Sequence, residues 1–194
     1  GEYVLVKLEA RFEERPLPRV SIIDMREQLK KGNRLALSLE LREDLSQCLK
    51  KGEQAMLFLN RRGYAGFVSC RSCGHVMKCP HCDVSLSEHN GRKLICHYCG
   101  YETVKPDKCP VCSSPYIGGF KAGTQQIQQV VEKEFPEARV LRMDYDTTRA
   151  KGSYEKILSA FSRHEADILI GTQMIVKGHD FPDVTLVGIL AADL

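Results

Sequence analysis

The sequence lacks the features that mark secreted and membrane-spanning proteins. Its 194 residues contain no signal peptide and no apolar run long enough to cross a bilayer. Low-complexity tracts and coiled-coil repeats are also absent, and a net charge of +3 is too small to dictate a partner. The chain is long enough for one good core and a small satellite. We therefore expect a cytoplasmic globular protein without a membrane partner.

Motifs for independent catalysis are missing too. Gly118-x4-Gly123-Thr124 has the glycine spacing of a phosphate-binding P-loop, but Thr124 stands where the lysine must be. Amides at a helix start there could still hold one backbone phosphate, and helix capping alone is the alternative. The strand-like run 188–193 has no second acidic residue after Asp193, and neither a catalytic triad nor a carboxylate pair occurs. The sequence therefore predicts no catalytic site of its own.

Cysteine is the residue that the sequence has in excess. Eight of its nine cysteines lie within residues 70–112 as four Cys-x-x-Cys pairs. The pairs are Cys70/Cys73, Cys79/Cys82, Cys96/Cys99 and Cys109/Cys112. Two thiolates at this spacing can hold one ion from a tight turn, and four thiolates complete a tetrahedral structural zinc site. Four pairs therefore predict two closed zinc sites.

A disulfide framework is the alternative for an even number of cysteines. It would require an oxidising compartment, and the missing signal peptide argues against one. A redox-active pair would follow a strand and open a helix, and none of the four pairs has that setting. The ninth cysteine, Cys48, lies in an apolar helical pattern and is expected to be a small core residue. We therefore favour two structural zinc ions.

The spacing between the pairs favours a nested arrangement. Thirteen residues separate Cys82 from Cys96, as in a zinc ribbon, where a hairpin joins two knuckles. If these inner pairs share one zinc, the outer pairs must share the other; sequential and crossed pairings are the alternatives. Four histidines lie among the cysteines: His75, His81, His89 and His97. Because eight thiolates already saturate two ions, we expect these histidines on the surface or behind the ligands.

The charge of segment 70–112 does not favour general binding to phosphate. The segment has six basic and four acidic side chains, and two four-thiolate zinc sites bring its balance to about −2. Arg92 and Lys93 at the hairpin tip could contact nucleic acid, and protein docking is an equal alternative.

Outside the cysteines, strands and helices alternate. Apolar runs predict strands over 54–60, 116–120, 139–143, 167–172 and 184–190, and periodicity predicts helices over 38–51, 124–135 and 153–161. Residues 3–8 are expected to form a short strand, and the apolar run 20–24 to enter the main domain. The pattern predicts a mostly parallel, three-layered α/β domain that the zinc module interrupts. Arg61 and Arg62 follow its first strand, where such sheets place ligands, although a solvated loop is the alternative.

Several ordered stretches resemble the bacterial primosomal replication-restart helicases. They are the run 57–64 leading into the cysteines, Gly123-Thr124 before a helix, the run 139–144 and the run 170–184. The last is similar to helicase motif V and contains Thr172, Gly178 and Asp180. The resemblance covers the chain from about Gly1 to Leu194. It implies a superfamily-two, 3′→5′ DNA helicase that reloads the replication machinery at stalled or branched forks.

The resemblance also implies cofactors, partners and contacts. Two zinc ions would be bound in the nested pairing, and ATP with Mg²⁺ would belong only to the full-length parent. DNA, primosome proteins and single-strand-binding protein are the implied partners. The hydroxyl of Thr172 at a strand end could hold a single-strand phosphate, while Gly178 permits a bend and Asp180 faces the nucleotide cleft. Alternatively, Thr172 and Gly178 only shape the turn. Gly123, Thr124, Arg61 and Arg62 complete the candidate DNA contacts.

A domain assignment follows from these inferences. Residues 1–19 would be the tail of an upstream region, 20–69 and 113–194 the two parts of a RecA-like second helicase lobe, and 70–112 a binuclear zinc insertion. The first motor lobe and the arginine-bearing motif VI are missing, so we expect an excised fragment that is inactive alone. A stand-alone zinc-dependent interaction module on an α/β scaffold is the alternative. A zinc hydrolase is disfavoured, because eight cysteines leave no open position on two ions.

Overall fold

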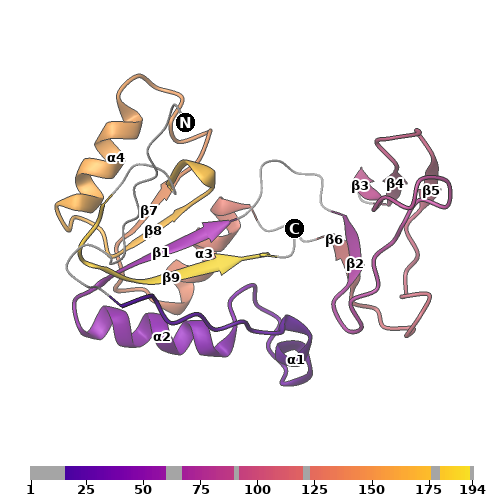
Figure 1. Cartoon of the computed structure of the whole chain (residues 1–194), viewed down its shortest axis with the longest axis horizontal. Helices are drawn as coiled ribbons and strands as arrows, with labels where there is room; N and C mark the ends of the chain where they lie inside the picture. The colour runs from indigo at the N-terminus through magenta and orange to yellow at the C-terminus, as the bar shows by residue number, and fades with distance from the viewer. Residues whose placement is uncertain (1–15, 60–66, 90–91, 120–122, 176–179, 193–194) are drawn as a thin grey trace, which may run out of the picture.

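A four-stranded parallel sheet forms the centre of the main domain in the computed structural model. The structure describes residues 16–59, 67–89, 92–119, 123–175 and 180–192. The strands are β1 (Gln54–Leu59), β7 (Val140–Met143), β8 (Ile168–Gly171) and β9 (Val184–Leu190). They lie in the order β7-β8-β1-β9, and every pairing is parallel. Their carboxyl ends therefore meet along one edge of the sheet (Figure 1).

Helices cover both faces of this sheet. Helices α2 (Leu39–Lys50) and α3 (Thr124–Glu134) share one core with strand residues such as Leu57. Helix α4 (Ser153–Ser162) packs on the other face, where its Phe161 is buried beside Met56 and Leu169. Neighbouring strand residues thus enter opposite cores, as the pleat of a strand requires. The predicted three-layered α/β fold is confirmed.

Helix α2 forms where capping and periodicity predict it. The Ser38 hydroxyl accepts the amide N–H of Leu41 at 3.0 Å, which satisfies one of the free donors of the first turn. Leu45 and Cys48 are buried, so Cys48 is the core residue that the pattern predicts. Gly52 follows the helix with a φ of +72°, a conformation that favours glycine.

Two predicted segments lie elsewhere than expected. Strand β6 (Ile117–Gly119) pairs antiparallel with β2 (Val68–Cys70) and not with the main sheet. Its two glycines lack the side chains that a strand covered on both faces needs. The run 20–24 forms no strand, and Ile22 is 95% exposed. Helix α1 (Met25–Lys30), capped by Asp24, follows instead and was not predicted. The strand expected over 3–8 lies outside the described residues.

The cysteine-rich segment forms a separate small unit at one end of the molecule. It contains the antiparallel strands β3 (Ser87–His89), β4 (Lys93–Ile95) and β5 (Glu102–Val104). The predicted hairpin between the inner cysteine pairs is β3–β4. The β2/β6 ladder forms the base of this unit, where the chain enters and leaves it (Figure 1).

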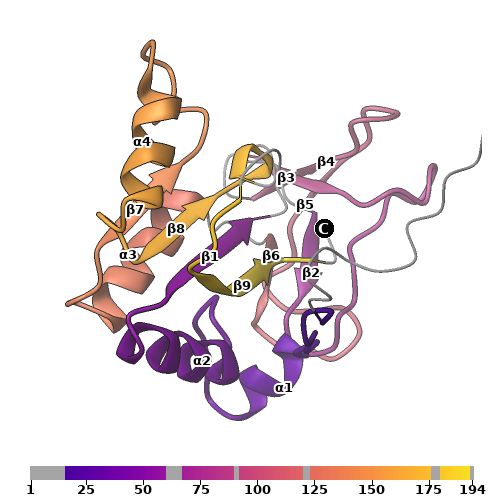
Figure 2. The same cartoon turned by 60° about the vertical axis from the view of Figure 1, so that its left-hand side comes forward.

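The base of the zinc module contacts the segment that follows α1. The guanidinium of Arg71 donates to the carbonyl of Arg34 at 3.2 Å, and the Arg34 guanidinium lies 5.6 Å from the ring centroid of Tyr116. Helix α1 and β2 accordingly lie near each other in both views (Figures 1 and 2). These contacts hold the base of the module against the segment that follows α1. Within the described part of the chain, no helix combines the length and apolarity needed to cross a bilayer.

Replacing Gly171, at the end of β8, should destabilise the main domain. An alanine Cβ there would lie 2.7 Å from the carbonyl oxygen of Met143 and 2.5 Å from Cγ2 of Ile175. Gly171→Ala should therefore lower the free energy of unfolding by about 1–3 kcal/mol, the usual cost of overpacking. Urea unfolding followed by far-ultraviolet circular dichroism measures this. Gly118→Ala is the control, because its Cβ would meet only Lys105 Nζ at 3.7 Å; equal losses in both variants would contradict the prediction.

Candidate metal centres

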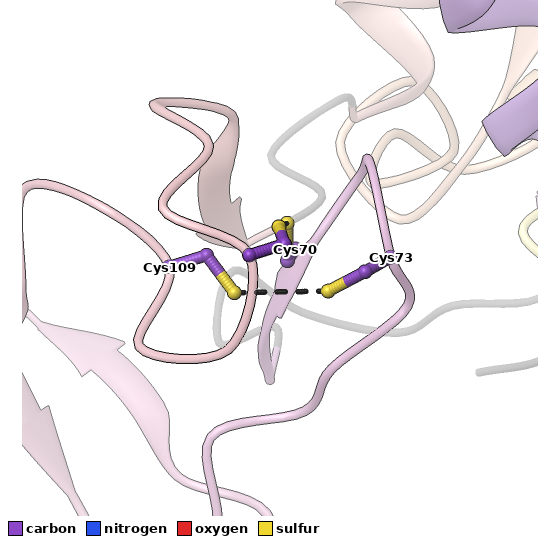
Figure 3. A group of neighbouring side chains, drawn as sticks. Cys70, Cys73 and Cys109 are labelled. Carbon is purple, nitrogen blue, oxygen red and sulfur yellow. Dashed lines mark hydrogen bonds between the residues drawn. The ribbon is translucent and has the colours of Figure 1, made fainter.

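The outer cysteine pairs meet in one cluster. Cys70 ends β2, Cys73 lies in the turn that follows, and Cys109 and Cys112 lie before β6. Their sulfur atoms all lie within 4.8 Å of one another. Cys73 and Cys109 face each other from two separate turns, 3.7 Å apart, with Cys70 beside them (Figure 3). Pairing of β2 with β6 thus brings together residues that are almost 40 positions apart in sequence.

The inner pairs meet in a second cluster. Cys79, Cys82, Cys96 and Cys99 also have all their sulfurs within 4.8 Å of one another. The Sγ atoms of Cys79 and Cys99 are 3.6 Å apart. This grouping is the nested arrangement, and not the sequential or crossed one.

The sulfur separations fit zinc ligation and not disulfides. A tetrahedron with Zn–S bonds of about 2.3 Å places its sulfurs about 3.8 Å apart, and the measured separations are 3.6–3.7 Å. A disulfide would require about 2.05 Å, and all nine cysteines are free. Each cluster holds four thiols with no carboxylate or histidine, the donor set of a closed structural site. The two clusters are therefore sites for two structural zinc ions.

All four Cys-x-x-Cys knuckles share one backbone turn. In each, the residue after the second cysteine has a positive φ and donates its N–H to the carbonyl of the first cysteine at 2.8–3.0 Å. These residues are Gly74, Asp83, Gly100 and Ser113. The first cysteine in turn donates its N–H to a carbonyl five residues ahead, at 2.8 Å in all four cases. Glycine follows only two of the pairs, whereas Asp83 and Ser113 follow the two pairs that contain proline. A search of the sequence for glycine would therefore find this turn in only two of the four knuckles.

The same turns favour thiolate ligands. The amide N–H of Cys99 donates to the sulfur of Cys96 and, with that of Tyr98, lowers the Cys96 pKa to about 7 despite burial. At Cys70, burial acts to raise the pKa of the thiol, but the backbone amides of Cys73 and Ser72 outweigh it and lower the pKa to about 7. Backbone amides thus stabilise the charged sulfurs that a zinc ion requires.

In the inner cluster, the pKa of the Cys82 thiol shifts in the opposite direction, upward. Its hydrogen bond to the sulfur of Cys99, together with burial, raises the pKa of Cys82 to about 12. Neighbouring thiolates repel one another, so the cluster retains protons that a divalent cation would displace.

The histidines of the module belong to neither cluster. Nε2 of His89 lies 3.0 Å from Nε2 of His97, and His81 packs edge-on against the ring of Tyr101 at 5.3 Å. At the hairpin tip, Arg92 pairs with Asp107 at 2.6 Å and Lys93 with Glu102 at 2.5 Å. Each of the two cations thus faces a carboxylate, which weakens the electrostatic attraction of this tip for phosphate.

Those candidate nucleic-acid contacts that the structure describes lie at the carboxyl edge of the main sheet. Thr172 directly follows β8, and Gly123 and Thr124 begin α3. The Thr124 hydroxyl donates to buried Asp144, and the Gly123 N–H donates to Gln126 Oε1 at 3.1 Å. The Gly123 contact is the one expected from helix capping, whereas the Thr124 hydroxyl makes a tertiary hydrogen bond to Asp144. Asp180 is exposed, while Arg61, Arg62 and Gly178 lie outside the described residues.

Asp144 is the residue of this edge that the sequence patterns did not single out. Burial opposes its ionisation, but the Thr124 hydroxyl and the Thr147 amide hold its pKa below the usual value. Arg142 Nε lies 3.3 Å from the same carboxylate. Asp144 therefore joins the start of α3 to the end of β7 as a charged, hydrogen-bonded link. Two signals in the sequence could have indicated it: a polar residue after an apolar strand, and its place at the end of the run 139–144 that carries the family resemblance.

Known proteins with related sequences align with both the main domain and the cysteine-rich segment. The family model described as the PriA DNA helicase Cys-rich region domain matches residues 79–103. The replication restart protein PriA of Bacillus subtilis (strain 168) is 55% identical over 194 residues, which is 100% of this chain and 24% of that protein. The replication restart protein PriA of Synechocystis is 50% identical over 97% of this chain and 23% of that protein. That of Haemophilus influenzae is 37% identical over 100% of this chain and 26% of that protein. The chain spans about a quarter of the length of these relatives.

Removing one inner ligand should empty one zinc site and leave the other. Cys82→Ser should lower the zinc content from two ions per chain to one, because three thiolates bind zinc more weakly than four. The part of segment 70–112 between the outer cysteine pairs should then unfold locally and be cut first by protease, while the outer zinc site and the main sheet survive. Elemental analysis and mass spectrometry of the digest measure both effects.

Cys48→Ser provides the matched control for this experiment. Cys48 is buried in the main domain, where its sulfur lies 3.7 Å from the Thr185 hydroxyl oxygen, away from both clusters. This variant should keep both zinc ions. Loss of zinc from Cys48→Ser, or uniform digestion of Cys82→Ser, would contradict the assignment.

Proposed function

Because the chain belongs to the PriA family of replication restart proteins, we propose that it supplies one motor lobe of an ATP-dependent 3′→5′ DNA helicase. The helicase acts at stalled or branched replication forks and initiates primosome assembly there. One observation carries the proposal: a parallel α/β sheet with two four-cysteine clusters inserted after β1, in a chain that aligns end to end with those relatives. Because the alignment includes the sheet as well as the cysteines, it favours a motor lobe over a stand-alone zinc module.

The proposal assigns a role to each part of the chain. Residues 1–19 belong to an upstream region, 20–69 and 113–194 to the second RecA-like lobe, and 70–112 to the zinc insertion. The zinc module contacts primosome proteins, single-strand-binding protein or DNA, and the parent works in the cytoplasm. ATP and Mg²⁺ bind only in the complete protein, between this lobe and a first lobe that carries the P-loop.

Single-stranded DNA would follow the carboxyl edge of the sheet. Parallel strands direct their carboxyl ends to one edge, where open α/β sheets bind ligands. In this proposal the Thr172 hydroxyl holds a phosphate, the start of α3 and Arg61 and Arg62 provide further contacts, and Gly178 and Asp180 couple the DNA to the nucleotide cleft. A segment that contacts DNA on one side and nucleotide on the other can couple hydrolysis to stepping.

Removing the Thr172 hydroxyl should weaken binding to single-stranded DNA. A hydrogen bond to a charged group contributes about 1.5–3 kcal/mol, so Thr172→Val should raise the dissociation constant roughly 10- to 150-fold. Fluorescence anisotropy of a labelled oligonucleotide with the zinc-loaded chain measures this. Thr185→Val is the matched control. Thr185 lies near the start of β9, at the amino edge of the sheet, and its hydroxyl donates to the carboxylate of Glu53. Equal affinities of the Thr172 variant and the unmodified chain would exclude this contact.

The isolated chain should hydrolyse no ATP. It has no P-loop lysine to reach the terminal phosphates, because Thr124 stands at that position. Phosphate release by the purified 194-residue chain, with and without single-stranded DNA, tests this expectation. DNA-stimulated turnover that survives repurification would show that the motor needs no second lobe.

A further inference from the structure

Tyr145 is an aromatic side chain that the core does not use. It follows β7 by two residues and is 73% exposed, whereas Phe161 in the adjacent core is fully buried. The Arg149 guanidinium lies 5.0 Å from the Tyr145 ring centroid, within the range of a cation–π contact. Arg149 is in turn paired with Asp146 at 2.9 Å. The ring is thus supported by one cation and remains largely accessible to solvent.

The turn that carries Tyr145 is held rigidly. Asp144 Oδ1 accepts the N–H of Thr147 at 3.0 Å, and the Asp144 N–H donates to the Thr147 hydroxyl at 2.9 Å. The Asp144 carbonyl accepts the Thr148 hydroxyl at 2.7 Å. A ring on such a turn loses little conformational entropy when a ligand packs against it.

This turn lies beside the proposed phosphate contact. Met143 of β7 and Gly171 of β8 are register partners, so the residues that follow them, Asp144 and Thr172, leave neighbouring strands together. Adjacent strands are about 4.8 Å apart. The Thr148 hydroxyl lies 3.8 Å from the sulfur of Met174, which connects the two loops beyond the sheet edge.

We propose that Tyr145, supported by Arg149, is a stacking platform for one base of single-stranded nucleic acid whose backbone is held next to Thr172. The inference rests on the proposed function and adds a base-binding site to it. Aromatic rings bind bases of any sequence, because every base has a π-face. The two nearby carboxylates do not oppose this, since Asp146 is paired with Arg149 and buried Asp144 with Arg142.

Removing the aromatic ring of Tyr145 should weaken binding to single-stranded DNA, whereas a substitution that keeps an aromatic ring should not. Base stacking on an aromatic ring contributes about 1–3 kcal/mol, so Tyr145→Ala should raise the dissociation constant for an oligothymidine roughly 5- to 150-fold. Tyr145→Phe should bind like the unmodified chain. Ile22→Ala is the control, because Ile22 is 95% exposed and lies outside both the zinc module and the proposed DNA contacts.

A spectroscopic readout separates stacking from a general loss of structure. The chain contains no tryptophan, so Tyr145→Trp introduces a single tryptophan at the platform, which can be excited selectively over the tyrosines. Its emission should be quenched when the zinc-loaded variant is saturated with oligothymidine, whereas that of Ile22→Trp should not change. Unquenched emission in Tyr145→Trp, or full affinity in Tyr145→Ala, would overturn the platform while DNA binding by the lobe stands. Failure of the unmodified chain to bind the oligonucleotide would instead overturn the proposed function and the platform with it.

Discussion

The zinc module depends on one constraint: its eight cysteine sulfurs must gather into two tetrahedral groups of four. Of the eight buried residues that form the module's core, four are cysteines: Cys70, Cys79, Cys96 and Cys109. A core this small cannot offset the conformational entropy of some 50 residues by apolar burial alone. Structural zinc sites in small peptides contribute roughly 10–16 kcal/mol of apparent binding free energy. The metal therefore replaces the apolar core that the module lacks.

The insertion leaves the parallel sheet intact because its two ends return to the same place. Strands β2 and β6 pair antiparallel, so Val68 and Gly119, near the two ends of the insertion between β1 and α3, lie side by side. Contacts of Arg34 with Arg71 and Tyr116 add a second connection at the base. These side-chain contacts hold the base of the module close to the segment that follows α1. Its net charge of about −2 with zinc bound favours specific contacts over a general attraction for DNA.

The main domain concentrates its polar side chains where the strands end. Buried Asp144 joins the start of α3 to the end of β7, and Thr172 leaves the neighbouring strand beside it. The apolar interior of the sheet holds these groups without taking part in binding, as is usual for open α/β folds. Rigid strands followed by short loops can thus position a phosphate contact and an exposed ring at a defined spacing.

The sequence by itself determined the cysteine knuckles, the alternation of strands and helices and the interruption of the sheet, because local spacing and periodicity encode all three. The cap of α2 at Ser38 and the core position of Cys48 followed from the same local rules. Only the tertiary structure decided that the run 20–24 stays exposed, that β6 pairs with β2, and that the Thr124 hydroxyl donates to Asp144. It also placed the turn that follows β7, with Tyr145 and Arg149, next to the strand that ends before Thr172. These features depend on which distant segments become neighbours, and such neighbours are set by the packing of the whole chain.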